Sequence, residues 1–115
     1  MKLSDVLTMG EIIENLVSTV SCGGNMLLNV GPSSDGVIPV IFRQRLITLG
    51  HWLNVNGEAI YSSSPWKCQN DTITDNVWYT TNIKVQKTFQ VFYPFYFLHI
   101  LEQECLRNFT IKIRN

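Results

Sequence analysis

The stretch GGNMLLNVGP, residues 23–32, decides how the rest of the chain is organised. Its apolar centre is closed by chain breakers at both ends. The two glycines can adopt positive φ angles and so end a preceding helix. Pro32 has no backbone N–H and restricts the residue before it, so the run stops there. A bounded apolar run of this length predicts a strand over residues 25–30 that is buried on both faces.

Helical patterns flank this run on both sides. Upstream, Thr8 and Glu11 form a capping-box pair and apolar residues follow at helical spacing, which predicts a helix over residues 9–21. Downstream, apolar residues recur with helical period and predict a second helix over residues 39–54. Asn56-Gly57 is expected to end this helix because both residue types tolerate the left-handed conformation. Helix, strand and helix in this order are a piece of an α/β architecture.

The second half of the chain has weaker patterns. Residues 58–61 are expected to be extended, and the serine-rich residues 62–65 are typical of a linker. The run VWYTT at 77–81 is rich in strand formers and predicts a strand. In the aromatic-rich remainder, residues 82–115, Pro94 argues against one uninterrupted central strand. The first interpretation of this remainder is an aberrant tail, and the alternative is a diverged pair of sandwich strands.

A longer quotation shows a family resemblance. Residues 17–66, VSTVSCGGNMLLNVGPSSDGVIPVIFRQRLITLGHWLNVNGEAIYSSSPW, closely resemble the α-L-fucosidases, family 29 of the glycoside hydrolases. The family carries similar runs, GGNLLLNVGP, then DG and IP, then NGEAIY, in the same order. The resemblance starts near Glu11 and extends through QNDTITDNVWYT at 69–80. It implies an α/β fragment of a (β/α)8 TIM-like barrel, its last helix, strand and helix, followed by short β segments.

The resemblance also implies a division of the chain into three parts. Residues 1–61 correspond to the C-terminal end of the catalytic barrel, residues 62–81 to a linker and the start of a C-terminal β-sandwich, and residues 82–115 match nothing. A complete barrel needs about 250 residues, so 115 residues hold only part of one. The strand over residues 25–30 is therefore expected to have few or no partners and to leave apolar faces exposed.

The implied activity is hydrolysis of terminal α-L-fucose from fucosylated glycans, without a metal or organic cofactor. A retaining glycosidase needs two carboxyl groups about 5 Å apart. In the family both come from earlier barrel strands, so no residue of this chain is assigned a catalytic role, and Asp35 and Glu58 are not expected to supply one. The alternatives are a non-catalytic truncated isoform or an interaction fragment. A free-standing carbohydrate-binding module fits poorly, because the first half is helical.

Asn29 and Gly31 are the candidate site residues. The C-terminal end of a barrel strand lies on the catalytic face, so both residues are expected to support the floor of the sugar pocket. Buttressing of neighbouring groups is the first expectation for Asn29, since an inward-facing Asn needs hydrogen-bond partners, and direct substrate contact is the alternative. His51 has no second histidine or cysteine at metal spacing, so no metal site is expected.

Sequence signals for compartment and modification are mixed. Asn70 begins the acceptor triplet NDT and is expected to be the usable glycosylation site, whereas Asn108 is not. The resemblance implies a lysosomal or secreted glycoprotein, yet no signal peptide opens the chain, which suggests that an N-terminal part is missing. The net charge is zero, so nothing indicates nucleic acid or an anionic membrane. The sequence does not give the oligomeric state, and contacts between copies could form through the parts of the enzyme that the chain does not match.

The cysteines and tryptophans are expected to be structural. Cys22 is expected to be a small buried residue and Cys68 to lie in a loop, while a Cys68–Cys105 disulfide stays open because spacing alone cannot establish it. Trp52 is expected to pack in the helix core. Trp66 and Trp78 are expected to pack at the junction of the two domains rather than to stack on sugars.

Overall fold

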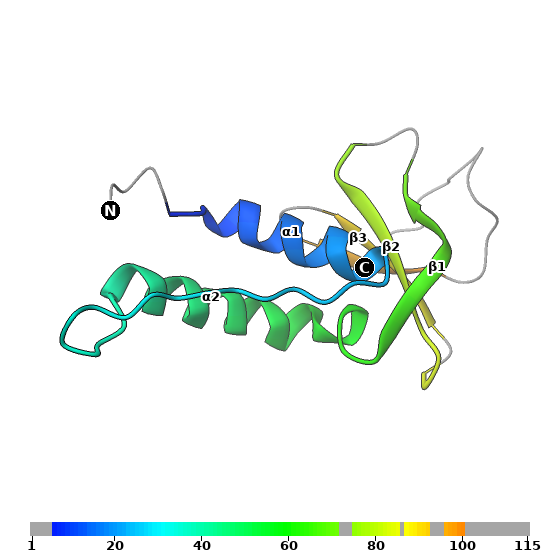
Figure 1. Ribbon diagram of the computed structural model, residues 1–115. Coiled ribbons are helices and arrows are strands. Elements are labelled where there is room, and N and C mark those ends of the chain that lie inside the picture. Colours follow the sequence, from blue (N-terminus) through cyan, green and yellow to red (C-terminus); the bar gives the residue numbers. More distant parts are fainter. Residues whose placement is uncertain (1–5, 72–74, 86, 93–95, 101–115) are drawn as a thin grey trace.

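Two helices run side by side and end on one antiparallel sheet (Figure 1). The computed structural model of the chain describes residues 6–71, 75–85, 87–92 and 96–100. The helices are α1, Met9–Ser21, and α2, Val40–Asn56, which continues into the 3-10 turn η2, Gly57–Ala59. The strands are β1, Ser63–Asn70, β2, Val77–Asn82, β3, Lys87–Phe92, and β4, Tyr96–Ile100, in the order β1-β2-β3-β4.

Helix α1 has the predicted bounds and the predicted cap. The Thr8 backbone N–H donates to Glu11 Oε2 at 2.7 Å, and the Glu11 N–H donates to Thr8 Oγ1 at 3.2 Å. These two bonds satisfy donors that a helix start otherwise leaves unpaired. Gly23 follows the helix with a φ of 85°, the conformation that the glycine was expected to supply.

Helix α2 begins and ends one or two residues later than predicted. Pro39 is its N-cap, and the helix continues to Asn56. The expected left-handed stop at Asn56-Gly57 is wrong, since the φ angles of these residues are −109° and −62°. The chain tightens into η2 instead, and the first positive φ comes later, at Ser62. The expected extended conformation of residues 58–61 is wrong for the same reason.

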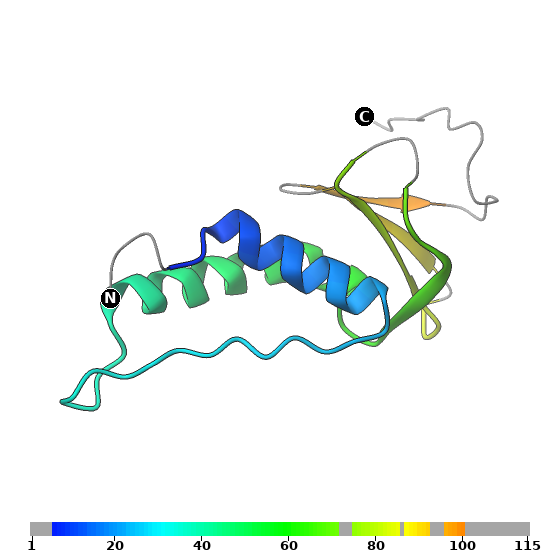
Figure 2. The ribbon, with the colours of Figure 1, turned by 45° about the horizontal axis from the view of Figure 1, so that its top comes forward.

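The segment that was predicted as a strand, residues 25–30, is extended but carries no strand pairing. It runs back along both helices, from the sheet end of α1 to the start of α2, as Figures 1 and 2 show together. A strand exists only when a neighbour takes up its backbone hydrogen bonds, and no described part of the chain lies in that position. The segment is therefore extended and, as expected, has no strand partner among the described residues, whereas the predicted burial of both faces is wrong, because Leu27 and Asn29 are exposed.

The sheet covers the C-terminal ends of both helices. Strand β2 pairs with β3 in an uninterrupted register from Val77↔Phe92 to Asn82↔Lys87, and β1 pairs with β2 across an irregularity between Pro65 and Asn70. Ser63 to Pro65 therefore belong to β1 and not to a linker, because their Cα partners are Asn82 to Thr80. Pro65 is tolerated there since β1 lies at an edge of the sheet.

Part of the aromatic remainder belongs to this sheet. Residues 87–92 and 96–100 form β3 and β4, as the strand-pair alternative expects for this part of the chain. Phe89 is fully buried against the helices. Cys105 and Asn108 lie outside the described residues, and the division of the chain into three parts stays a prediction.

One core joins the helices to the sheet. It draws side chains from α1, α2, η2 and β3, namely Ile12, Ile13, Leu16, Val17, Leu49, Ala59, Phe89 and Val91. Trp52 and Trp78 are partly buried against it, which confirms Trp52 as a packing residue of the helix core. At roughly 25 cal/mol per Å² of apolar area, such burial is the main source of stability in a domain of this size. The core holds helices and sheet together as one unit.

Polar side chains of the sheet cap the end of η2. The Thr80 hydroxyl donates to the Ala59 carbonyl at 2.7 Å in a fully buried position. The Asn82 amide donates to the carbonyls of Glu58 and Tyr61 at 3.3 and 3.1 Å. Helix ends leave carbonyl groups without partners, so side chains that reach them from another element fix one element on the other.

Candidate functional site

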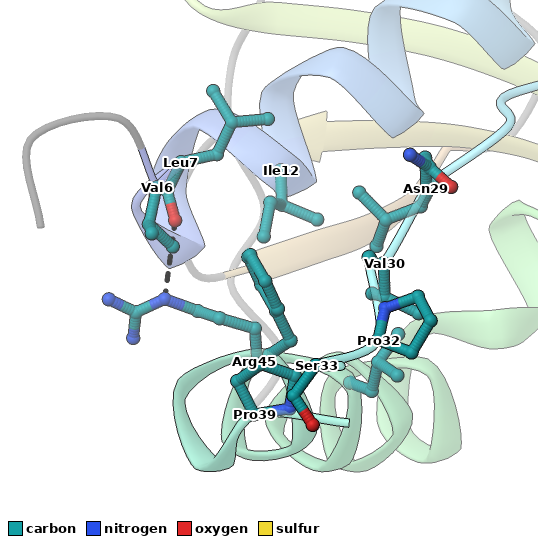
Figure 3. Close-up of a pocket in the computed structure, with 13 residues that line it drawn as sticks. Val6, Leu7, Ile12, Asn29, Val30, Pro32, Ser33, Pro39 and Arg45 are labelled. Atoms are coloured by element: carbon teal, nitrogen blue, oxygen red, sulfur yellow. Dashed lines mark hydrogen bonds between the residues drawn. The ribbon is translucent and has the colours of Figure 1, made fainter. Parts of the chain in front are cut away.

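A groove lies where the extended segment meets the N-terminal ends of both helices (Figure 3). Its volume is about 570 Å³. It is lined by residues 28–33 of the segment, by Val6, Leu7 and Ile12 at the start of α1, and by Pro39, Phe42, Arg45 and Leu46 at the start of α2. Most of the lining is apolar, and the groove lies at the C-terminal end of the segment.

Alternate residues of the segment face opposite ways. Met26 and Leu28 are partly buried and pack against the core, whereas Leu27 is 95% exposed and Asn29 is exposed. A period of two is the side-chain pattern of a β-strand, so the segment already has a strand's two faces. One face lies on the helices, and the other meets solvent in this structure.

Asn29 and Gly31 both lie on the groove, as Figure 3 shows for Asn29. The Asn29 side chain has no hydrogen-bond partner among the described residues, so the structure shows no neighbouring group that it positions. A Cβ added at Gly31 would meet no heavy atom within 4 Å, so none of the described residues requires a glycine there. The support role of both residues stays a prediction.

Two further lining residues hold the groove in shape, Ser33 of the turn cluster and Arg45, which the sequence did not single out. Arg45 is the only charged residue among the described lining, and its Nε donates to the Leu7 carbonyl at 3.2 Å, which joins α2 to the chain before α1. Ser33 closes the far end by accepting the Val37 N–H at its hydroxyl, at 3.3 Å. A serine that opens a turn cluster signals this bond, whereas Arg45 and Leu7 lie too far apart in sequence.

The carboxylates of the matched core do not meet at the groove. Asp35 precedes α2 and Glu58 follows it, and a helix of 17 residues is about 26 Å long. No carboxylate belongs to the described lining of the groove. Glu58 lies 3.6 Å from the Lys87 ammonium, where it joins η2 to β3. Neither residue is placed as half of a catalytic pair, which needs a separation near 5 Å.

Among the described residues, Glu11 and Tyr79 have shifted pKa values. The backbone and side-chain hydrogen bonds from Thr8 lower the pKa of Glu11, which fits its role in the helix cap. Burial, with a smaller contribution from the charge of Asp71, raises the pKa of Tyr79 to about 12. Tyr79 lies on the sheet, across a strand pair from Gln90, whose amide donates to its hydroxyl at 3.5 Å. Both groups are structural.

The remaining candidate residues lie away from the groove. His51 is exposed on α2. The Trp66 ring lies 5.3 Å from that of Tyr79, and the Lys67 ammonium lies 5.2 Å from the Trp66 ring centroid. Trp66 therefore packs within the sheet, and its ring already has a cation as neighbour. Asn70 is exposed at the end of β1, in a position accessible for modification.

The cysteines differ from what the sequence suggested. Cys22 is exposed and free, so the expected burial is wrong. It caps the end of α1, where its backbone and not its side chain is required. Cys68 lies on β1 rather than in a loop, and it is disulfide-bonded.

The described residues contain no group of three or more histidine, cysteine, aspartate or glutamate side chains that could hold a metal ion. Neither described helix has the length and the apolar character that crossing a membrane requires.

Sequence comparisons relate the chain to one family of enzymes. The family model described as Alpha-L-fucosidase matches residues 1–58. The chain is 52% identical to the plasma alpha-L-fucosidase of Homo sapiens over 90 residues, which are 78% of the chain and 19% of that protein. It is 57% identical to the human tissue alpha-L-fucosidase over 81 residues, which are 70% of the chain and 17% of that protein. The chain thus spans about a fifth of these relatives.

Solved structures give the same relation. An alpha-fucosidase of Thermotoga maritima superposes with a TM-score of 0.70 at 36% identity, covering 78% of the chain and 21% of that protein. A Bacteroides thetaiotaomicron alpha-L-fucosidase, solved as a trapped covalent intermediate, superposes with a TM-score of 0.66 at 30% identity and covers 73% of the chain and 18% of that protein. The arrangement of helices, segment and sheet is therefore similar to one part of these larger enzymes.

Proposed function

Because the chain belongs to the alpha-L-fucosidase family, we propose that it carries the C-terminal part of a fucoside-hydrolysing (β/α)8 barrel and the beginning of the domain that follows. Residues 1–61 supply the last helix, strand and helix of the barrel. The 115 residues contribute one wall of a sugar pocket and not the reacting carboxylates. The substrate class is fucosylated glycans, by relation to enzymes that are named for fucose.

The position of the groove carries this proposal. In (β/α)8 enzymes the active site lies at the C-terminal ends of the strands, where the helices begin. The groove lies at the C-terminal end of residues 25–30 and at the N-terminal ends of α1 and α2. The sheet lies at the other end of the segment (Figure 1).

The two faces of the segment support the same assignment. Barrel strands place one set of side chains against the outer helices and the alternate set toward the barrel interior. Met26 and Leu28 pack on the helix side. Leu27 and Asn29 then face the interior, where Leu27 fills a layer of the barrel core. Asn29, nearer the catalytic end, orients groups of the pocket by hydrogen bonds to residues from other strands.

The chemistry that we propose for the complete barrel is retaining hydrolysis. The Bacteroides thetaiotaomicron relative was trapped as a covalent intermediate, and a covalent glycosyl-enzyme is the mark of that mechanism. The nucleophile and the acid/base come from outside this chain's groove, whose described lining has no carboxylate. The chain contributes one wall of the pocket, and Asn29 contributes a hydrogen-bonding side chain to it.

A chimera tests this function. The matching segment of human tissue alpha-L-fucosidase, 57% identical over 81 residues, is replaced by that of this chain, and hydrolysis of an aryl α-L-fucoside is measured. We expect an active enzyme in which Asn29→Ala lowers kcat/KM by about tenfold or more, whereas Asn25→Ala, on the same segment, has little effect. A folded chimera that is inactive, or that is equally impaired by both substitutions, would contradict the proposal.

A secretory or lysosomal location goes with this function. One relative is named a plasma enzyme, and the disulfide at Cys68 is typical of an oxidising compartment. Asn70 is then the glycosylated residue. With a signal peptide added, secreted protein should show a glycosidase-sensitive gel shift that Asn70→Gln removes. A shift that survives Asn70→Gln and disappears in Asn108→Gln would contradict the assignment.

A further inference from the structure

Residues 25–30 present two unused backbone edges. Within the described residues, the last hydrogen bond before this run is donated by the Gly24 N–H and the next by the Ser33 N–H. The N–H and C=O groups between them are held in an extended conformation by the packing of Met26 and Leu28 on the helices. A strand binds more readily to a backbone that is already extended, because that backbone loses little further conformational entropy on binding.

The edge strand β1 of the same molecule is protected against pairing with another chain. It carries Pro65, Lys67 and an irregular register between Pro65 and Asn70. A proline, a lysine and a bulge are the usual devices that keep a sheet edge from pairing with another chain. Residues 25–30, NMLLNV, contain none of these devices. Leu27 is 95% exposed on this run.

The charge distribution fits a second copy as the occupant. No charged residue occurs between Glu14 and Asp35, so two identical edges can approach without like charges facing each other. The net charge of the whole chain is zero, so no long-range repulsion separates two copies. Uncharged runs of about six residues with good strand propensity are the kind that pair with themselves.

We propose that residues 25–30 are a strand-pairing edge through which this chain binds a second copy of itself. Backbone hydrogen bonds supply the contact, and exposed apolar side chains beside the edge, Leu27 above all, lose water when the strands meet. The inference goes beyond the proposed function, since it concerns the 115-residue chain when no neighbouring barrel strands occupy these edges.

Sedimentation velocity over a wide range of concentration tests this pairing. We expect the weight-average sedimentation coefficient of the 115-residue chain to rise with concentration. Leu27→Lys places like charges at the paired edge and should weaken self-association about tenfold or more. Val55→Lys is the matched control, because Val55 is also an exposed apolar residue, at 71%, but lies on α2. It should associate like the parent chain.

Amide hydrogen exchange identifies the surface directly. In the associated form, amides of residues 25–30 should exchange more slowly than in dilute solution, and the same amides of Leu27→Lys should not. A chain that stays monomeric at every concentration overturns the proposal. So does equal weakening by Leu27→Lys and Val55→Lys, or association that leaves the amides of residues 25–30 unprotected.

Discussion

The two ends of α2 differ in the hydrogen bonds and the packing that the rest of the chain gives them. At the C-terminal end, carbonyl groups of Glu58, Ala59 and Tyr61 accept hydrogen bonds from Thr80 and Asn82, and the core joins helix to sheet. At the N-terminal end, α2 borders an apolar groove and a segment whose backbone bonds nothing among the described residues. Hydrogen bonds and the core therefore hold the sheet end, whereas the backbone of the segment at the groove end has no such bonds among the described residues.

The largest expected difference between the two ends is in packing. Phe89→Ala removes a fully buried ring from the core and should lower the free energy of unfolding by about 3–5 kcal/mol. Leu27→Ala, on the exposed side of the segment, should change it by less than about 0.5 kcal/mol. Urea unfolding at low concentration measures both. Equal effects would mean that β3 is no part of the folded unit.

Hydrogen bonding should show a smaller difference. The Asn82 side chain donates to two carbonyls and accepts from the Lys84 N–H at 3.1 Å. Asn82→Ala leaves these groups unpaired in a buried position and should cost about 1–3 kcal/mol. Asn29→Ala is the matched control at the groove end, and we expect no measurable change in the unfolding midpoint. A loss of stability in Asn29→Ala would reveal a structural role that the present contacts do not include.

Alkaline titration should give the smallest difference. The pKa of Tyr79 is raised to about 12 in the folded chain, above the ordinary value near 10. Tyr79 therefore contributes stability that is fully present below pH 10 and is lost as the pH rises toward 12. Tyr79→Phe should flatten this part of the stability curve, measured by urea unfolding at stepped pH.

Local signals in the sequence were sufficient for the first half of the fold. The capping pair Thr8 and Glu11 and the stop at Gly23 act within a few residues, so α1 was predicted to the residue. The segment over residues 25–30 is extended and unpaired among the described residues, as expected, but its predicted burial on both faces was wrong, because Leu27 and Asn29 are exposed. Burial of the second face depends on a neighbour that the local sequence cannot show.

Asn29 and Gly31 lie on the groove, and their expected support of a sugar pocket stays a prediction. Arg45 was missed because its bond to Leu7 joins residues 38 positions apart, which no local pattern reveals.

Hydrolysis of an aryl α-L-fucoside by the purified 115-residue chain, against a mock preparation, shows whether this chain holds a catalytic carboxylate. We expect no turnover above background, because the groove has no carboxylate among its described lining and because Asp35 and Glu58 lie at opposite ends of α2. Clear turnover that is abolished by Asp35→Asn or Glu58→Gln would contradict it. That result would mean that this chain holds a catalytic carboxylate of its own.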